Sequence, residues 1–444
     1  MATPRIVNLN VTQTVAAQPS LLQQTGALVS QGGTSLAVNA TQFLSQLLDL
    51  TALLKAPLAL TSLAWASGTV TATASVAHGV TVGGTFLTTI AGAVPSSYNG
   101  TYVATATTST AFTYALAVSP GTETTPGTYT PPGVAELVAM ATTFFDQGTV
   151  TGCYVLELGA AAFPIAGISD LQAWITANPG VFYSYLCPTE WDAATGFAAF
   201  LQNYESTESK TYFFVTATQA NLATYTALMK CVFALVPSPT APASEFTCAA
   251  PFYSILNNQP SAVSQVPPTA FRYMPATTPW PAQGYSTNIN AILTGNGNLI
   301  LTGAEGGISN ATLFKGTTAD GNDFSYWYSV DWVQINAELQ LANAVINGSN
   351  NPQNPLYYNQ AGINALQKVA QGVMNSGIAF GLVLAPVTVV ATPFYVYTTE
   401  NPNDYSIGKY NGLAVTYTPQ LGFKQITFNV QVSGFVQQPA SQGG

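Results

Sequence analysis

The central part of the sequence alternates between short apolar runs and stretches with a helical pattern. The apolar runs have strand length and lie at 153–158, 181–187, 211–216 and 231–236. The helical stretches lie between them, at 169–177, 192–205 and 218–229. Ser169 and Gln172 have the spacing of a capping box, and Asn178-Pro179-Gly180 ends the first helix. Strand–helix alternation of this kind predicts a mainly parallel sheet with right-handed crossovers.

A second pattern occupies residues 61–132, where Thr, Val, Ala and Gly dominate. Strand-like runs are separated there by Gly, Pro, Ser and Asn, and they lie at 69–76, 85–90, 100–106 and 111–116. Turn signals spaced by about 8–12 residues are typical of a small β-barrel or sandwich. A Pro-, Gly- and Thr-rich stretch at 119–133 reads as the linker back to the rest of the chain.

The last third of the chain mixes helical and strand patterns. Apolar residues at three- and four-residue steps predict one helix over 331–347, stopped by Gly348, and another from Ile363 to Gly377. Strands are expected at 379–398, 410–418 and 423–433, and a helix at 40–54. The sequence therefore predicts an α/β (α+β multidomain) fold. We expect its segments at 1–60, 61–132, 133–283 and 284–444.

Composition excludes several classes of function. Only 6% of the 444 residues are charged, and two arginines and seven lysines cannot form the basic stripe that nucleic-acid binding needs. No run of about 18 apolar residues occurs, so we expect no membrane insertion. His78 is the single histidine, and neither a C-x-x-C pair nor a P-loop motif is present. We therefore expect no cofactor, no metal and no enzymatic activity.

The four cysteines lie in or near apolar runs, at Cys153, Cys187, Cys231 and Cys248. We favour free, buried thiols, and disulfides remain the alternative. The N-terminal MATPRIVNLN lacks the basic segment and apolar core of a signal peptide, which favours a reducing cytoplasm. A chain with so few charges and 48% hydrophobic residues suggests that other copies cover part of its surface.

Two acidic residues follow the apolar run at 181–187. Ligands of open parallel sheets bind beyond the carboxyl ends of the strands, and Glu190 and Asp192 fall in that zone with Trp191 between them. A glycan-cleaving carboxylate pair is one interpretation. The structural interpretation, which we prefer, is that Asp192 caps the next helix and Glu190 is solvated.

Three further candidates have simpler explanations. Asp320-Gly321-Asn322-Asp323 has cation-binding residue types but lacks the spacing of a calcium loop, so a polar turn is preferred. Glu157 stands inside an apolar run, which a strand-end or interface position would explain. His78 is expected in a turn of the β insert.

The strand patterns at the two ends of the chain say more about function than the candidate sites above. Near each end, apolar residues alternate with Asn, Thr, Gln or Ser, as in a half-buried strand; they are Ile6, Val7, Leu9, Val11, Ile426, Phe428, Val430 and Val432. Such a strand either joins its own domain or adds to the sheet of a neighbouring subunit. Flexible flanks and the lack of protective lysines favour the second arrangement.

The layout resembles the sheath subunits of contractile bacteriophage tails and related injection machines. The resemblance covers mainly the two ends of the chain, about half of it, and several segments carry it: the strand at 6–11, the passage from Asn288 through Gly303 to 327–332, Asn354-Pro355-Leu356-Tyr357-Tyr358-Asn359-Gln360-Ala361-Gly362-Ile363, and Ser376-Gly377-Ile378-Ala379. In addition, Ala77-His78-Gly79-Val80-Thr81-Val82-Gly83-Gly84 and Tyr98-Asn99-Gly100-Thr101-Tyr102 look like a small β module of phage structural proteins.

The resemblance implies a subunit of stacked hexameric rings around a tail tube, within a virion tail assembled in the bacterial cytoplasm. It implies an inner domain built from 1–60 and 284–444, with 61–132 and 133–283 projecting outward. Its partners would be other copies, the tube protein, and baseplate and terminator proteins. Many sheath subunits face an acidic tube with basic residues, and only Lys409 and Lys424 are available here for that contact. The alternatives are another tail component (tube or baseplate) and a glycan-binding or glycan-cleaving surface protein.

Overall fold

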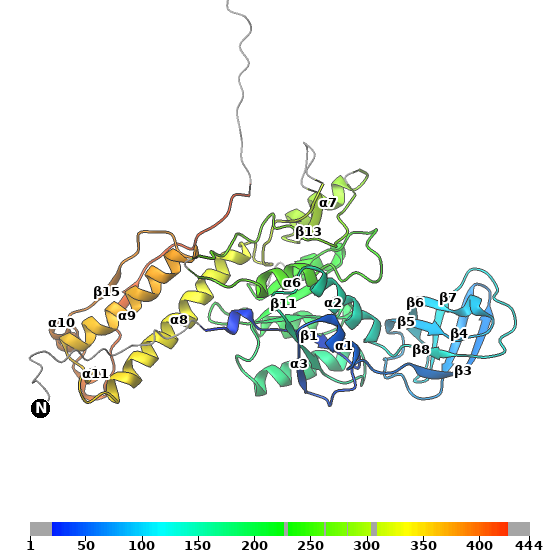
Figure 1. Ribbon diagram of the computed structural model, residues 1–444, viewed down its shortest axis with the longest axis horizontal. Helices are drawn as coiled ribbons and strands as arrows, with labels where there is room; N and C mark the ends of the chain where they lie inside the picture. Colours follow the sequence, from blue (N-terminus) through cyan, green and yellow to red (C-terminus); the bar gives the residue numbers. More distant parts are fainter. Residues whose placement is uncertain (1–19, 226–229, 262, 282, 303–308, 425–444) are drawn as a thin grey trace, which may run out of the picture.

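The computed structural model describes residues 20–225, 230–261, 263–281, 283–302 and 309–424. Three parts follow one another along the long axis of the molecule (Figure 1). A β-barrel lies at one end, a sheet flanked by helices lies in the centre, and a pair of long helices lies at the other end.

The central sheet confirms the predicted parallel topology. In the described residues it has six strands in the order β12-β11-β10-β1-β9-β2. The four predicted strands are β9 (Cys153–Glu157), β10 (Ser184–Leu186), β11 (Tyr212–Thr216) and β12 (Val232–Leu235). All neighbouring strands pair in parallel except β2 (Thr41–Leu44), which is antiparallel to β9.

Strand β1 (Gly26–Ser30) was not predicted, although it lies between β10 and β9 and all five of its residues are buried. Only Ala27, Leu28 and Val29 are apolar, and glycines and glutamines surround them. The expected helix at 40–54 is wrong for most of its length. Residues 41–44 form β2, and only α1 (Leu47–Thr51) is helical.

Side chains that alternate along the strands enter two separate cores. Leu28, Val155 and Phe214 face α2 (Val134–Asp146), α6 (Ala249–Leu256) and the start of α8 (Phe324–Ser349). Val29, Leu156 and Phe213 face the other layer, which contains α3 (Ile165–Ala177), α4 (Phe197–Gln202), α5 (Leu222–Tyr225) and α7 (Ser286–Thr294). A sheet buried on both faces is what a run of consecutive apolar residues predicts.

Several connections are shorter or more irregular than predicted. Helix α3 ends where Asn178-Pro179-Gly180 indicated, but it begins four residues before Ser169, whose hydroxyl bonds back to the Ala166 carbonyl. The helix expected at 192–205 is split into η3 (Thr189–Ala193) and α4. The described part of 218–229 contains η4 (Gln219–Asn221) and α5.

The β insert is a closed barrel and not a sandwich. Its strand order is β3-β4-β7-β6-β5-β8, formed by β3 (Leu58–Ala66), β4 (Thr69–Ala74), β5 (Thr85–Ala91), β6 (Gly100–Ala106), β7 (Ala111–Ala115) and β8 (Thr128–Tyr129). A short helix, η2 (Ser96–Tyr98), lies between β5 and β6. Phe86, Phe112 and Tyr129 fill the interior. Closure leaves no free sheet edge in the insert.

Two long helices form a hairpin at the far end of the molecule (Figure 1). Helix α8 begins seven residues before the predicted start, and α9 (Gln360–Ala379) extends beyond Gly377. Neither glycine acts as the predicted stop. Gly348 lies within α8, and Gly377 lies within α9, where a Cβ atom would come within 2.9 Å of Val383.

The remaining elements include two small antiparallel sheets and an η1 turn (Leu22–Gln24) before β1. One sheet pairs β13 (Leu299–Thr302) with β14 (Ala311–Phe314). The other pairs β15 (Val389–Ala391) with β16 (Leu413–Val415). The strand expected at 379–398 is largely wrong, because residues after β15 form α10 (Phe394–Glu400), followed by α11 (Pro402–Ser406). The strand predicted at 423–433 lies outside the described residues, apart from its first two.

Candidate functional site

The predicted terminal arms lie outside the described residues. These are Ile6, Val7, Leu9, Val11, Ile426, Phe428, Val430 and Val432. The structure does show where both arms join the molecule. The main-chain N–H of Ser20 donates to Asn336 Oδ1 (3.2 Å), and Lys424 Nζ lies 3.7 Å from Asp323 Oδ2.

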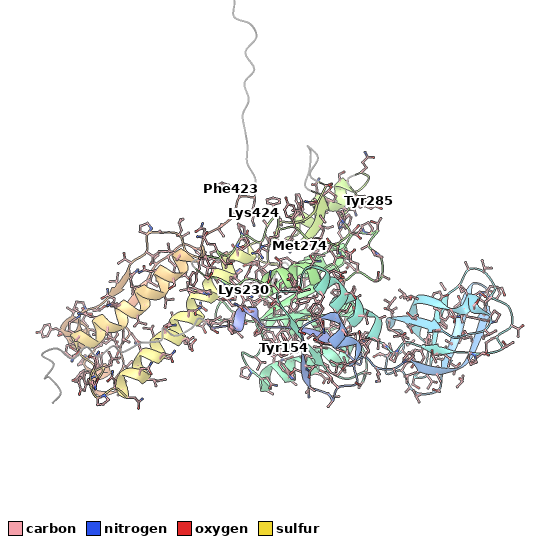
Figure 2. The ribbon with its side chains drawn as sticks, in the orientation of Figure 1. Tyr154, Lys230, Met274, Tyr285, Phe423 and Lys424 are labelled. Carbon is pink, nitrogen blue, oxygen red and sulfur yellow. The ribbon has the colours of Figure 1, made fainter. Side chains whose placement is uncertain are left out.

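Both contacts are made to α8 or its N-cap. Asn336 lies in the middle of α8, and Asp323 caps its start by accepting from the Ser325 N–H (2.9 Å). Figure 2 shows Phe423 and Lys424 together where the described chain leaves this region. Asn336 lies thirteen residues after Asp323, which is about 20 Å along the axis of α8, and the helical rotation places the two contacts on different sides of the helix.

The part of the molecule beyond the sheet exposes many large apolar side chains. Those around α10, α11 and β15 include Val390 (62%), Tyr395 (79%) and Ile407 (71%). Tyr357, Tyr405 and Val415 are also exposed. Contiguous apolar patches are typical of interaction surfaces, and single side chains as exposed as these also occur elsewhere in the described residues, for example Val118 (76%).

Within this surface, the β15–β16 sheet has one covered edge and one free edge. The Val389 N–H donates to Gln371 Oε1 (2.8 Å), and Gln367 Nε2 donates to the Val389 carbonyl (2.8 Å). These two side chains from α9 replace a neighbouring strand along β15. In the alternating antiparallel pattern, Leu413 and Val415 therefore direct their N–H and C=O groups away from β15. Among the described residues, no strand pairs with that outer edge of β16.

The candidate basic contacts have different environments. Lys409 is exposed, and its carbonyl accepts from the Tyr358 hydroxyl (2.7 Å). Lys424 is partly exposed but is paired with Asp323. The structure therefore leaves Lys409 as the freer cation of the two.

Glu190 and Asp192 do not act as a pair. The Asp192 carboxylate accepts from the Thr218 N–H (2.9 Å), Asn221 Nδ2 (2.9 Å) and the Tyr225 hydroxyl (2.6 Å). It holds the turn after β11, and does not cap the helix that follows it. Because its oxygens are occupied in this way, the glycan-cleaving interpretation loses one of its two carboxylates.

Glu190 contacts Glu136 of α2 and is not solvated as expected. Burial raises the pKa of the Glu190 carboxyl well above its usual range, and the charge of Glu136 raises it further. Burial also raises the pKa of Glu136, opposed by the N–H of Thr189, which donates to it (2.7 Å). Two carboxyl groups in contact hold a proton more tightly than either does alone.

The other three candidates are structural. Asp320 Oδ2 accepts from Trp327 Nε1 (2.8 Å) and Asn322 Nδ2 (2.7 Å), which closes the predicted polar turn. His78 is buried in the barrel between Phe86 and Phe112, and its Nδ1 accepts from the Val80 N–H (3.1 Å).

Glu157 stands at the end of β9, as the strand-end interpretation predicts. Its carboxylate accepts from Gly32 and Gly159 N–H (both 2.7 Å) and from the Ser30 hydroxyl (2.7 Å). The Thr34 N–H and hydroxyl also donate to it. It is a buried anchor for the loop that follows β1.

An ion pair between Lys230 and Asp331 was not predicted. Lys230 Nζ lies 2.6 Å from Asp331 Oδ1, and both side chains are fully buried. Asp331 Oδ2 accepts from the hydroxyls of Tyr183 (2.9 Å) and Tyr212 (2.6 Å). Figure 2 places Lys230 in the molecule's centre, where the sheet meets α8. The only sequence signal was a lysine directly before the apolar run at 231–236.

The four cysteines are buried free thiols, as favoured from the sequence. Burial raises the pKa of each, to about 12 for Cys231. No cluster of three or more His, Cys, Asp or Glu side chains suited to a metal occurs in the described residues. Across the same part of the chain, no helix has the length and apolar character to span a bilayer.

Two solved structures share this fold over 97% of the chain. A chain of the anti-feeding prophage baseplate, determined by cryo-EM with sixfold symmetry, matches with a TM-score of 0.54 and 11% identity over 97% of this chain and 100% of that chain. A chain of the same baseplate in its contracted state matches with a TM-score of 0.52 and 13% identity, over 97% and 99%. The protein has the fold of these baseplate chains. The predicted α/β multidomain class is thereby confirmed.

Two crystal structures of sheath tail proteins also match. The Listeria innocua protein is 10% identical over 85% of this chain and 89% of its own (TM-score 0.41). The Desulfitobacterium hafniense protein is 11% identical over 86% and 93% (TM-score 0.40). The fold assignment rests on the two baseplate chains. No family model and no curated protein matches the sequence.

Proposed function

We propose that the protein is a non-enzymatic structural subunit of a contractile tail sheath. In this proposal it forms stacked hexameric rings around a tail tube and contracts to drive the tube into a host. The observation that carries the proposal is the overlap with a complete chain of a contractile baseplate over 97% of this chain. Residues 1–60 and 284–444 would form the inner domain, with 133–283 and the barrel of 61–132 outside it.

The attachment of both arms to α8 supports strand exchange between copies. Ser20 and Lys424 contact Asn336 and Asp323, so both arms start beside the half of α8 that packs against the sheet. We propose that an arm of a neighbouring copy adds to the outer edge of β16. The glutamines of α9 cover only the β15 edge of the small sheet, so the β16 edge stays free. Main-chain hydrogen bonds between an arm and β16 would persist when the subunits rotate as rigid bodies.

The arms and the edge can be tested separately by electron microscopy of purified protein. Deleting residues 1–12 or 424–444 should leave the sheet and barrel folded but abolish long tubes. Phe428→Asp should do the same, because it places a charge on the buried face of a shared sheet. Val415→Pro removes an outward N–H at the edge of β16 and should also abolish tubes, whereas Val415→Thr keeps that N–H and should form them. Full-length tubes from the truncated proteins would refute the arm linkage.

A subunit of the baseplate itself is the second candidate, because the two matched chains belong to baseplate structures. The same images distinguish the two. Long tubes of uniform width indicate a sheath, whereas closed rings or plates of limited size indicate a baseplate.

A further inference from the structure

A polar cavity of about 380 Å³ lies beside the C-terminal end of α6. Tyr253 and Ser254 of α6, Asn257 and Asn258 after it, and Arg272 border it. Met274, which also lines the cavity, lies over α6 in Figure 2. None of the described residues that line it is an Asp or a Glu.

Arg272 is one of only two arginines in the chain, and among the described residues no carboxylate lies within ion-pair distance of it, the charge of the more distant Asp323 being the one that acts on it. Both ion pairs of the described residues involve lysines. Its Nε donates to the Pro268 carbonyl (2.8 Å), and Nη2 donates to the Pro267 carbonyl. Nη1 donates to the Ser254 hydroxyl (2.7 Å), the Ser254 carbonyl (2.8 Å) and Asn258 Oδ1 (3.2 Å).

These contacts use four of the five guanidinium N–H groups, so one on Nη2 remains. Burial lowers the Arg272 pKa to about 10, which still leaves the group charged at neutral pH. Carbonyl groups near the end of α6 provide only partial negative charge.

Asn258 supplies a second unused donor. The residue is 6% exposed and its Oδ1 accepts from Arg272, but its Nδ2 has no partner. A buried amide donor without a partner is uncommon and destabilising. The neighbouring Asn257 Oδ1 is also unpartnered, which suits a water or a ligand hydroxyl.

We propose that this cavity is a carboxylate-binding site. One N–H of Arg272 and the Asn258 amide offer two donors, which matches the two oxygens of a carboxylate, and the ligand supplies the missing counter-charge. The carboxylate comes either from a free small acid or from an Asp or Glu side chain of another copy.

The test measures thermal unfolding of the full-length protein at pH 7 in acetate and in chloride of equal ionic strength. Acetate should raise Tm by about 2 °C over chloride. Acetamide, which has the same shape without the charge, should not. A missing acetate effect, or an equal effect of acetamide, would overturn the proposal whether or not any variant folds.

Asn258→Asp provides the carboxylate within the chain, because Oδ1 already contacts the guanidinium. This variant should unfold at a higher temperature than wild type in chloride and lose its response to acetate. Asn257→Asp adds the same charge at a position with no contact to Arg272, so it should keep the wild-type response. An acetate shift that persists in Asn258→Asp, or disappears equally in Asn257→Asp, contradicts the assignment.

The source of the carboxylate is distinguished by assembly. If a neighbouring copy supplies it, acetate and Asn258→Asp should both slow tube formation. If a free acid is the ligand, neither should change it. Either result supports the site, and the unfolding experiment stands even if the protein forms no tubes.

Discussion

The ion pair between Lys230 and Asp331 joins α8 to the sheet, and removing one charge should destabilise the protein strongly. In Asp331→Asn the shape is retained and one oxygen still accepts from Tyr183 or Tyr212. The ammonium of Lys230 is left fully buried without a counter-charge. Breaking a buried pair in this way costs about 3–5 kcal/mol of the free energy of unfolding.

Removing the lysine should give a different, pH-dependent result. Burial already raises the pKa of Asp331, and Lys230 opposes that rise. In Lys230→Met the folded-state pKa of Asp331 therefore rises further above its unfolded value. The folded state then binds the extra proton, so the variant should regain stability as the pH falls from 8 to 5.

The double variant Lys230→Met/Asp331→Asn carries no buried charge and keeps an acceptor for the tyrosines. It should lie within about 2 kcal/mol of wild type, so with each single variant costing about 3 kcal/mol or more the coupling energy is at least about 4 kcal/mol. Urea unfolding at pH 7, followed by circular dichroism and tryptophan fluorescence, measures all three variants. Lys424→Met is the control: it breaks an ion pair with a partly exposed lysine and should cost less than about 1 kcal/mol. Additive costs in the double variant, or a loss below about 1 kcal/mol in Asp331→Asn, would refute this account.

Two further perturbations probe the carboxyl pair and the packing of α9. Because the pKa of Glu136 and Glu190 is raised in the folded state, their contribution to stability is lost as the pH rises through the folded-state pKa, by at most about 1.4 kcal/mol per pH unit for one proton. Glu190→Gln should therefore raise Tm more at pH 8 than at pH 5, and an equal change at both would contradict a shared proton. Gly377→Ala should destabilise the folded protein by about 1–3 kcal/mol, because its methyl group would meet Val383 at 2.9 Å. Gly372→Ala has open space in the same helix, so it should stabilise the folded protein by about 0.5–1 kcal/mol. Denaturant midpoints that move in the same direction for both alanines would show that the packing argument is wrong.

Local sequence patterns predicted the strands of the sheet and barrel well. A strand buried on both faces is a continuous apolar run, and a strand buried on one face alternates apolar and polar residues. They failed where burial depends on distant residues. The short run Ala27–Val29 becomes the central strand β1 only because β9 and β10 flank it. Likewise α10 begins in a sequence, Phe394-Tyr395-Val396-Tyr397, whose composition favours a strand.

The same limit on local sequence patterns applies to the candidate sites. The strand-end position of Glu157 could be interpreted from its own neighbours, but its partners Ser30 and Gly32 are more than fifty residues away in the sequence. The same is true of the partners of Glu190 and Asp331. Single-sequence periodicity contains no information on such pairs. Arg272 and Asn258 lie only 14 residues apart, but an irregular segment joins them, and no pattern places two such side chains together.

Helix α8 connects these observations. With 26 residues it is about 39 Å long, and its first half is buried against the sheet while its second half packs on α9. Asp331 lies in the buried half, where an ion pair and two tyrosines fix the helix against the sheet. Such a junction resists bending, because any shift of α8 would separate two buried charges. Under the proposed function, the subunit should therefore move as a rigid body during contraction, with the change taken up in the terminal arms and at the surface around α10. Disulfide or chemical crosslinks between α8 and the sheet should leave contraction intact, whereas crosslinks that fix an arm to its own subunit should block it.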